Sequence, residues 1–267
     1  MKPISNTAFY CCGVRMDDAE TPNPVCGDVY AKSFMSEAGL RVYEAFRGET
    51  RPNASNVARH RIIDELLRAE VRDDPGKQIV LIGAGFDSRA YRLGGGKWVE
   101  LDEPQVIAYK EERLPCNLCK NPLQRVPIDF ASESLEEKLL PFSTPAPTAV
   151  VIEGVFMYLQ QDVIRDLLGV LRRVFPAHKL ICDLMSRPFF DKYTRTFHEK
   201  IVDVGTSFVV MDQPEEVFLA NGYRPLQRIS IVRRAVELGA IKVGNLPPFL
   251  ARLGTPDGYS VWVFEPS

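Results

Sequence analysis

The sequence contains no apolar run that approaches the roughly 20 residues of a membrane-spanning helix. Its first residues, MKPISNTAFYCC, have no continuous apolar core of the kind found in a secretory signal peptide. It also lacks an excess of positive charge, because 33 lysines and arginines are outnumbered by 35 acids and the formal net charge is −2. We therefore expect a cytoplasmic protein that binds neither a membrane nor nucleic acid.

Metal-ligating side chains are scarce, with three histidines and six cysteines among 267 residues. Cys116 and Cys119 have the spacing of a metal-binding or redox pair, but the sequence has no second such pair and no paired histidines nearby. We therefore expect no metal site. In a reducing compartment we also expect free thiols, and Cys11 and Cys12 are better explained as small apolar side chains than as nucleophiles.

The composition is that of a folded globular protein, with 45% hydrophobic and 25% charged residues. Residues 30–46 have the apolar spacing of one or two short helices, and residues 56–73 predict an amphipathic helix with one apolar stripe. We assign residues 1–75 to a helical cap that contributes to a substrate pocket. Residues 76–267 are assigned to the core domain.

Strand-like and helix-like segments alternate from residue 78 onward. The strand-like segments are QIVLIGAG, KWVELD, QRVPIDF, TAVVIEGV and KLICDLM, and a helix-like segment follows each of the first four. Such alternation requires right-handed crossovers and hence a mostly parallel sheet with helices on both faces. The near-continuous valine, isoleucine and leucine of these strands agrees with burial on both sides. We therefore expect an α/β fold, with one further helix over residues 189–205.

Two glycines, Gly83 and Gly85, stand where the first strand turns into the following helix. In open parallel sheets a ligand binds beyond the carboxyl ends of the strands, and glycines at this turn let a cofactor approach the backbone closely. The next strand ends on Asp102, 17 residues after Gly85. This is close to the roughly 20-residue spacing at which a carboxylate binds the ribose of an adenine-containing cofactor. The sequence therefore favours a nucleoside site over a tight turn without a ligand.

This nucleoside site favours S-adenosylmethionine over a dinucleotide for two reasons. A dinucleotide site has a third glycine that lets the helix pack closely while it faces a pyrophosphate, and here that position is Ser88. In addition, about 75 residues precede the first strand, whereas dinucleotide domains tend to begin with it. A helical cap of this kind is often what a methyltransferase uses to close over a small substrate.

Two further strand ends carry side chains suited to this cofactor. Asp129 and Phe130 offer a hydrogen-bond acceptor and an aromatic face for an adenine, and Glu153 lies where the fourth strand opens into the predicted cleft. A buried carboxylate is costly unless a positive group meets it, and the methionyl end of S-adenosylmethionine is such a group. Each acid alone is equally consistent with a helix cap or a solvated loop, but three acids at three successive strand ends favour a shared site.

Arg59 falls in the middle of the apolar stripe of the helix predicted over residues 56–73, at about 100° per residue. The pattern therefore predicts that its side chain points inward, where a guanidinium needs a carboxylate partner. The methionine moiety of the cofactor and a carboxylic acid substrate both supply one. The alternative is that Arg59 reaches out to solvent at the start of the helix.

Several motifs resemble those of one known family. They are NTAFYCCGVRM, NPVCGDVYAKSFM, ARHRIID, LIGAGFDSRAYRL, WVELDEP, PIDFA, VIEGVFMYL and DGYSVWVFE, and together they cover nearly the whole chain. The chain resembles the leucine carboxyl methyltransferase family, specifically its bacterial branch of S-adenosylmethionine-dependent O-methyltransferases associated with polyketide-type small molecules. The resemblance implies a class I methyltransferase fold, Rossmann-like with a seven-stranded and mostly parallel sheet. It also implies an enzyme whose cofactor is S-adenosyl-L-methionine.

The resemblance also implies which residues bind the ligands. The cofactor contacts of the family match Arg59, Gly83, Asp102, Asp129, Phe130 and Glu153. In the eukaryotic relatives a tyrosine and an arginine help to hold the acceptor carboxylate, and Tyr158 and Arg59 match these positions. Those relatives methylate a protein C-terminus, but the N-terminal segment of this chain differs most from theirs. The resemblance therefore implies a small acid or a phenol as the methyl acceptor.

The chemistry of the acceptor decides whether a general base is needed. A carboxylate is ionised at neutral pH and needs none, so catalysis would consist mostly of positioning. A phenol or alcohol needs one, and His60, Tyr10 and Tyr158 are the candidates. Two other functions stay open, namely a catalytically silent S-adenosylmethionine-binding regulatory module and a nicotinamide-dependent oxidoreductase. The sequence does not define the oligomeric state.

Overall fold

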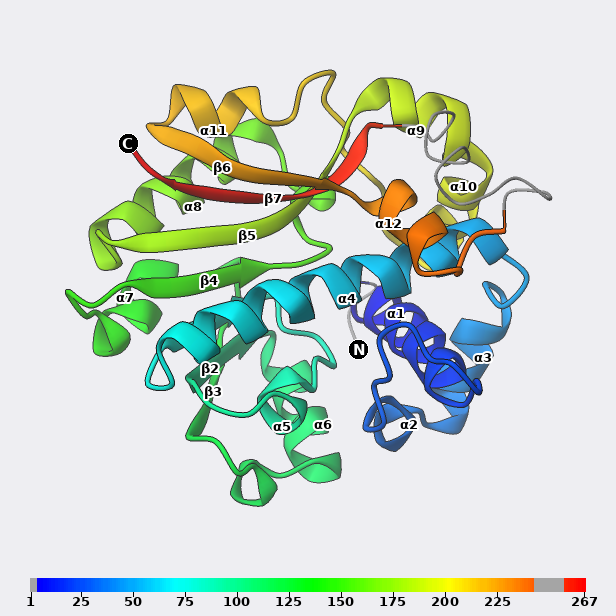
Figure 1. Cartoon of the computed structure of the whole chain (residues 1–267), viewed down its shortest axis with the longest axis horizontal. Helices are drawn as coiled ribbons and strands as arrows, with labels where there is room; N and C mark the ends of the chain where they lie inside the picture. Colours follow the sequence, from blue (N-terminus) through cyan, green and yellow to red (C-terminus); the bar gives the residue numbers. More distant parts are fainter. Residues whose placement is uncertain (1–3, 243–256) are drawn as a thin grey trace.

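Seven strands form one sheet within the residues that the computed structural model describes, 4–242 and 257–267 (Figure 1). Their order across the sheet is β3-β2-β1-β4-β5-β7-β6. The strands are β1 (Gln78–Ile82), β2 (Lys97–Asp102), β3 (Leu123–Pro127), β4 (Thr148–Ile152), β5 (His178–Met185), β6 (Tyr223–Ser230) and β7 (Tyr259–Pro266). Neighbours from β3 to β5 pair in parallel, and β7 is antiparallel to β5 and β6. The predicted α/β fold with a mostly parallel sheet is confirmed.

Helices cover both faces of the sheet because its central strands carry apolar side chains on both sides. Leu81 of β1 packs in one cluster with Ile63 of the long helix α4 (Thr50–Asp73), which runs across the sheet in Figure 1. Val80 points to the opposite face and packs in a second cluster with the apolar stripe of α8 (Gln161–Val174). Burial on both faces thus explains the uninterrupted apolar run of β1.

Shorter helices connect these elements. They are α5 (Arg89–Arg92), α6 (Pro104–Arg113), α7 (Leu135–Leu139), α9 (Arg187–Tyr193), α10 (Arg195–Asp203), α11 (Glu216–Ala220) and α12 (Ile231–Glu237), with 3-10 turns η1 (Cys116–Leu118), η2 (Leu140–Phe142) and η3 (Phe156–Tyr158). The single helix predicted over residues 189–205 is wrong, because α9 and α10 are separate and meet at Thr194. The backbone of Thr194 has φ −122° and ψ −6°, outside the helical region, and its hydroxyl contacts Met185 Sδ at 3.7 Å.

The N-terminal segment packs around an aromatic core formed by Phe9, Phe34 and Phe46. Its helices are α1 (Ile4–Ala19), α2 (Ala31–Phe34) and α3 (Glu37–Glu44). Gly39 lets α3 approach α1 closely, since a β-carbon there would lie 2.4 Å from Phe9 Cδ1. Helix α4 contacts α1 at one end and the sheet along its length. The division into a cap of residues 1–75 and a core of 76–267 stays a prediction, because α4 packs with both, and residues 1–3 and 243–256 lie outside the described residues.

Helices of the described residues lack the combination of length and apolarity that a membrane crossing requires. All six cysteines are free thiols. The thiol of Cys119 donates to the carbonyl oxygen of Ala90 at 3.1 Å, and burial raises the pKa of Cys116 to about 12. Burial therefore favours the protonated thiol at both Cys116 and Cys119.

Candidate functional site

A cavity of about 920 Å³ opens at the carboxyl ends of the central strands, where the strand order reverses between β1 and β4. Its described lining includes the loops after β1, β2 and β4, the helices α1, α4, α8 and α12, and the segment that contains α9 and α10. This edge of an open parallel sheet is where such folds bind their ligands. The volume lies near the top of the range of roughly 300–1,000 Å³ for ligand pockets.

The turn after β1 has the geometry that its two glycines predict. Gly83 and Gly85 adopt φ values of +70° and +47°, which residues other than glycine rarely adopt. A β-carbon at Gly83 would lie 2.6 Å from Val155 Cγ2. The backbone N–H of Gly83 donates to the carbonyl oxygen of Leu101 at 2.9 Å, which ties the turn to β2. Both glycines line the cavity.

Asp102, at the end of β2, holds this turn and also faces the cavity. Its Oδ2 accepts a hydrogen bond from the N–H of Gly85 at 2.6 Å, and its Oδ1 accepts one from the N–H of Glu103 at 2.7 Å. Burial raises the pKa of Asp102 above its ordinary value. A carboxylate offers about four lone-pair sites, so two are left for ligand hydroxyls.

Arg59 points inward, as its position on the apolar stripe predicts, and is 6% exposed. Its Nε donates to Glu153 Oε1 at 3.0 Å, and its Nη1 donates to Asp183 Oδ2 at 3.1 Å and to the hydroxyl oxygen of Tyr259 at 2.7 Å. The remaining nitrogen, Nη2, has no hydrogen-bond partner among the described residues. The protein itself thus supplies carboxylates for Arg59, and one nitrogen of a cavity-lining guanidinium stays available.

Glu153 follows β4 and is held from two sides. Besides Arg59 at Oε1, Arg89 Nη1 donates to Oε2 at 2.8 Å. Burial alone would raise the pKa of Glu153, but Arg89, His60 and Arg59 hold it well below its ordinary value. The sequence predicted that a positive ligand would offset the burial of this acid. In the structure two arginines already do so, and the carboxylate stays ionised.

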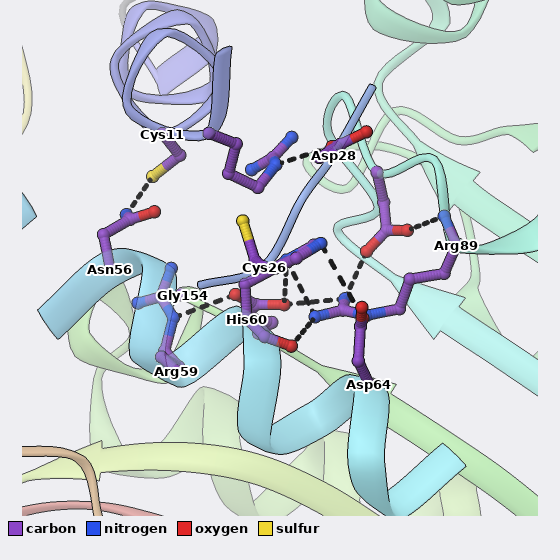
Figure 2. Close-up of polar contacts among 12 residues, drawn as sticks. Cys11, Cys26, Asp28, Asn56, Arg59, His60, Asp64, Arg89 and Gly154 are labelled. Carbon is purple, nitrogen blue, oxygen red and sulfur yellow. Dashed lines mark hydrogen bonds and ion pairs between the residues drawn. The ribbon is translucent and has the colours of Figure 1, made fainter. Parts of the chain in front are cut away.

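These residues belong to a larger network of buried charges, part of which is drawn in Figure 2. Arg89 Nε donates to Asp64 Oδ1 at 2.6 Å, and Arg92 Nη1 donates to Asp64 Oδ2 at 2.6 Å. At the end towards α1, Arg15 Nε donates to Asp28 Oδ2 at 2.9 Å. The network therefore joins α1, α4 and α5 to the ends of β4 and β5.

His60, Asp87 and Glu153 place potential metal ligands within 4.8 Å of one another. The guanidinium of Arg89 already lies among them, because its Nη1 pairs with both acids and its Nη2 lies 2.8 Å from His60 Nδ1. A positive charge is thus present at the point where a cation would bind. The cluster fits an arginine better than a metal ion.

The three candidate bases are poorly suited to accept a proton. Both ring nitrogens of His60 lie near guanidinium nitrogens, at 2.8 Å from Arg89 and 2.7 Å from Arg92, and burial and Arg89 lower its pKa. Burial raises the pKa of Tyr10 well above its ordinary value, and its hydroxyl donates to Asn53 Oδ1 at 3.1 Å. Burial likewise raises the pKa of Tyr158. None of these groups is disposed to act as a general base at neutral pH.

The remaining predicted residues divide into two groups. Phe130 and Tyr158 line the cavity, with Phe130 43% exposed and the ring of Tyr158 5.2 Å from that of Phe208. Asp129 does not line the cavity, and its carboxylate accepts hydrogen bonds from Ala131 N at 3.2 Å and Ser132 Oγ at 2.9 Å. The structure therefore brings together every predicted site residue except Asp129, which lies in the adjacent loop.

One part of the cavity lining is aromatic. Its described lining includes Tyr10, Phe189, Tyr193, Phe197, Phe208 and Tyr259. Asn56, one turn before Arg59 on α4, also lines it, and its Nδ2 donates to Cys11 Sγ at 3.2 Å (Figure 2). This part of the cavity suits an organic molecule with a flat apolar body.

Two functional residues were missed by the sequence analysis. Asp183 lies inside β5, in the segment ICDLM, and accepts hydrogen bonds from Arg59 and from Gly154 N at 2.6 Å. The rule that selected Asp102 and Glu153 looks for an acid at a strand end and passes over it, because β5 continues to Met185 while its neighbour β4 ends opposite Cys182. Arg89 had no comparable signal, because the four residues of α5 are too few to show a buried face.

Comparison with known proteins shows similarity to methyltransferases. A family model described as leucine carboxyl methyltransferase matches residues 9–172. A Streptomyces coelicolor protein named provisionally as an S-adenosyl-L-methionine-dependent methyltransferase is 29% identical over 194 residues, which are 64% of this chain and 62% of that protein. One of the same description from Mycolicibacterium smegmatis is 31% identical over 60% of this chain and 59% of its own length. The chain thus spans about three fifths of the length of these relatives.

Solved structures share the fold. A DUF574-family protein from Streptomyces avermitilis has a TM-score of 0.58 at 12% identity and covers 94% of this chain and 99% of that one. A geranyl diphosphate methyltransferase in complex with SAM has a TM-score of 0.52 at 12% identity, with 82% and 91% covered. The strand order and these neighbours define the fold as that of class I methyltransferases. Since the family model matches more than half of the residues, the chain belongs to the leucine carboxyl methyltransferase family.

Proposed function

We propose that the protein is an S-adenosylmethionine-dependent O-methyltransferase that esterifies a carboxylate of a small organic molecule, such as a polyketide-type acid. The family, the cofactor named in its relatives and the cavity at the strand ends support the methyltransferase part. The poor suitability of His60, Tyr10 and Tyr158 as bases carries the choice of a carboxylate. The aromatic part of the cavity supports an acceptor with a flat apolar body.

The residues present fit this cofactor. Gly83 and Gly85 line the cavity in left-handed backbone conformations, in the strand-to-helix turn where a nucleoside can approach the backbone closely. Asp102 would accept hydrogen bonds from the ribose hydroxyls, and Phe130 would stack on the adenine with Asp129 nearby. The ionised Glu153 would accept hydrogen bonds from the ammonium of the methionyl end. The unpaired Nη2 of Arg59 would donate to a carboxylate of the cofactor or of the acceptor.

S-adenosylmethionine, when bound, supplies a methyl group on a positively charged sulfur. A carboxylate oxygen of the acceptor forms the new O–CH₃ bond while the C–S bond breaks, and the bonding pair of that C–S bond stays on sulfur. The products are a methyl ester and a neutral thioether, and no proton moves. The chain's own task is then to align the two ligands and exclude water, with Arg59 and Tyr158 holding the acceptor.

The absence of proton transfer explains why the site can work without a base. Burial keeps Tyr10 and Tyr158 protonated, and the guanidinium groups of Arg89 and Arg92 occupy both ring nitrogens of His60. A phenol acceptor would need one of these groups to take its proton, since its own pKa is about 10. A carboxylic acid acceptor has already lost its proton at neutral pH.

The test is methyl transfer from S-adenosylmethionine labelled in its methyl group. Benzoic, cinnamic and decanoic acids are each compared with a matched hydroxyl compound, namely phenol, cinnamyl alcohol and decanol. We expect label in the acids, recovered as methanol after alkaline hydrolysis, because esters are cleaved by alkali and ethers are not. Alkali-stable label in the hydroxyl compounds would overturn the choice of a carboxylate.

Two further outcomes separate the alternative functions. Binding of S-adenosylhomocysteine without turnover of any acceptor favours the silent regulatory module. A melting temperature raised by NADH but not by S-adenosylhomocysteine favours the oxidoreductase, because a ligand specific for the folded state stabilises it by mass action.

A further inference from the structure

Arg89 is buried beside the cavity without forming part of its described lining. Its side chain is 0% exposed, yet Nη1 reaches Glu153, a residue that does line the cavity. An arginine in such a place affects a ligand only through the groups that it holds. The contacts of Arg89 therefore decide what it does.

The guanidinium of Arg89 is anchored on every side. Nε donates to Asp64 Oδ1 at 2.6 Å, Nη1 pairs with Asp87 and with Glu153 Oε2, and Nη2 donates to the carbonyl oxygen of His60 at 3.0 Å. The partners come from α4, from the loop after β1 and from the loop after β4. The planar group is thus fixed in position and orientation before it meets Glu153.

Glu153 is in turn fixed at both oxygens. Arg59 Nε binds Oε1 at 3.0 Å and Arg89 Nη1 binds Oε2 at 2.8 Å. With one donor at each oxygen, the carboxylate cannot rotate about its last bond without losing a hydrogen bond to a charged partner, which is worth roughly 1.5–3 kcal/mol. About two of its four lone-pair sites remain for a group in the cavity.

We propose that Arg89 is a positioning residue, which orients the Glu153 carboxylate to receive the ammonium of the methionyl end of the cofactor. The inference rests on the proposed function, because it assumes that S-adenosylmethionine binds in the cavity. The inference adds to the proposed site a residue that touches neither the cofactor nor the acceptor. Lysine at position 89 keeps the charge but lacks the planar fork whose separate nitrogens hold Asp64 and Glu153 in a fixed orientation.

The experiment uses two ligands that differ at the methionyl end. S-adenosylhomocysteine carries the amino acid moiety, whereas 5′-methylthioadenosine keeps the adenosine and the sulfur but lacks it. Dissociation constants are measured by calorimetry for the wild type, Arg89→Lys and Arg92→Lys. Arg92 is the matched control, because it is buried and pairs with Asp64 and Asp28 but not with Glu153.

We expect Arg89→Lys to raise the dissociation constant of S-adenosylhomocysteine by about tenfold or more, which corresponds to about 1.4 kcal/mol. The dissociation constant of 5′-methylthioadenosine should stay within about twofold of the wild-type value. Arg92→Lys should change the dissociation constant of neither ligand by more than about twofold. A general disturbance of the site would lower both affinities together. Equal losses for both ligands in Arg89→Lys, or no loss for either, would overturn the proposal.

Failure of the proposed function has a different signature. If the wild type binds neither ligand, the cofactor assignment fails and the role of Arg89 falls with it. If the wild type binds both ligands and Arg89→Lys does not separate them, the cofactor assignment stands and the role of Arg89 falls.

Arg89→Lys can fail to fold, because it leaves buried carboxylates without full partners. The charge-balanced double variant Arg89→Gln/Asp64→Asn then replaces it, with the same expected separation of the two ligands.

The wild type supplies a further measurement that does not depend on any variant. The groups that face Glu153 are Arg59 and His60 from α4, Arg89 from α5 and Asp87 from the loop before it. Two arginines keep Glu153 ionised, so the ratio of the two affinities should stay constant from about pH 8 to about pH 5. A ratio that falls across this range would contradict a carboxylate held by Arg59 and Arg89.

Discussion

The turn at Gly83 permits a sharp test of the site's construction through the substitution Gly83→Ala. Gly83 has a φ of +70°, and an added β-carbon would lie 2.6 Å from Val155 Cγ2. The substitution therefore introduces two separate penalties. One is the left-handed backbone conformation, and the other is the steric overlap with the side chain that follows β4.

The two penalties have known sizes. A residue with a β-carbon in the left-handed region costs roughly 1–2 kcal/mol, and overpacking of a filled site costs about 1–3 kcal/mol. We therefore expect Gly83→Ala to lower the free energy of unfolding by about 2–5 kcal/mol. Val155→Ala removes the carbon that the new β-carbon would meet, so it relieves the second penalty and leaves the first.

The assay is guanidinium-induced unfolding of the wild type, both single variants and the double variant. The double variant should be more stable than the sum of the single effects by about 1–3 kcal/mol. Gly94→Ala is the control, because a β-carbon there meets nothing within 4 Å and φ lies outside the left-handed region. Effects of equal size at Gly83 and Gly94, or strictly additive effects of Gly83→Ala and Val155→Ala, would refute the reasoning.

Three further predictions concern the charged groups. Asp102→Ala should abolish binding of S-adenosylhomocysteine in calorimetry, and micromolar affinity in that variant would rule out the ribose role. Arg59→Ala removes the cation that pairs with buried Asp183 and leaves Glu153 with Arg89 alone, so it should lower the free energy of unfolding by about 3–5 kcal/mol and weaken the binding of both cofactor and acceptor; unchanged affinities would count against its role. Burial lowers the pKa of His60, so only the unfolded chain takes up this proton, and stability should fall as the pH drops below about 6.5, by at most about 1.4 kcal/mol per pH unit. Denaturation of the wild type and His60→Gln at about pH 7 and pH 5.5 measures this, and equal losses in both would exclude His60 as the source.

Much of the fold follows from periodicity along the chain. The apolar runs of β1 and β4 predict strands buried on both faces, and their alternation with helices predicts a parallel sheet. The prediction of one helix over residues 189–205 was wrong because the chain is interrupted at Thr194, between α9 and α10. Thr194 has a non-helical backbone conformation, and its hydroxyl contacts Met185 of β5. An interruption at a single residue does not change the apolar periodicity of the sequence.

The strand ends were the predictable part of the site. Gly83, Asp102 and Glu153 lie on the cavity because the carboxyl ends of parallel strands meet at one edge of the sheet. What the sequence could not give is the pairing among the charges. Arg89 and Glu153 are 64 residues apart, and an acid can pair with any arginine that the tertiary structure brings near. The sequence therefore predicted that Glu153 needs a positive partner without identifying two arginines of the protein as that partner.

The buried pairing between the N-terminal helices and the core limits which N-terminal segments of relatives can replace that of this protein. Asp28 accepts hydrogen bonds from Arg15 within the N-terminal segment and from Ser88 in the core, and Arg15 also donates to the carbonyl oxygen of Phe86. A chimera that grafts a relative's first 50 or so residues onto this core would bury unmatched charges unless the graft brings both an acid and an arginine at these positions. New acceptor specificities are therefore more readily reached by substitutions within the existing cavity wall than by swapping the whole segment.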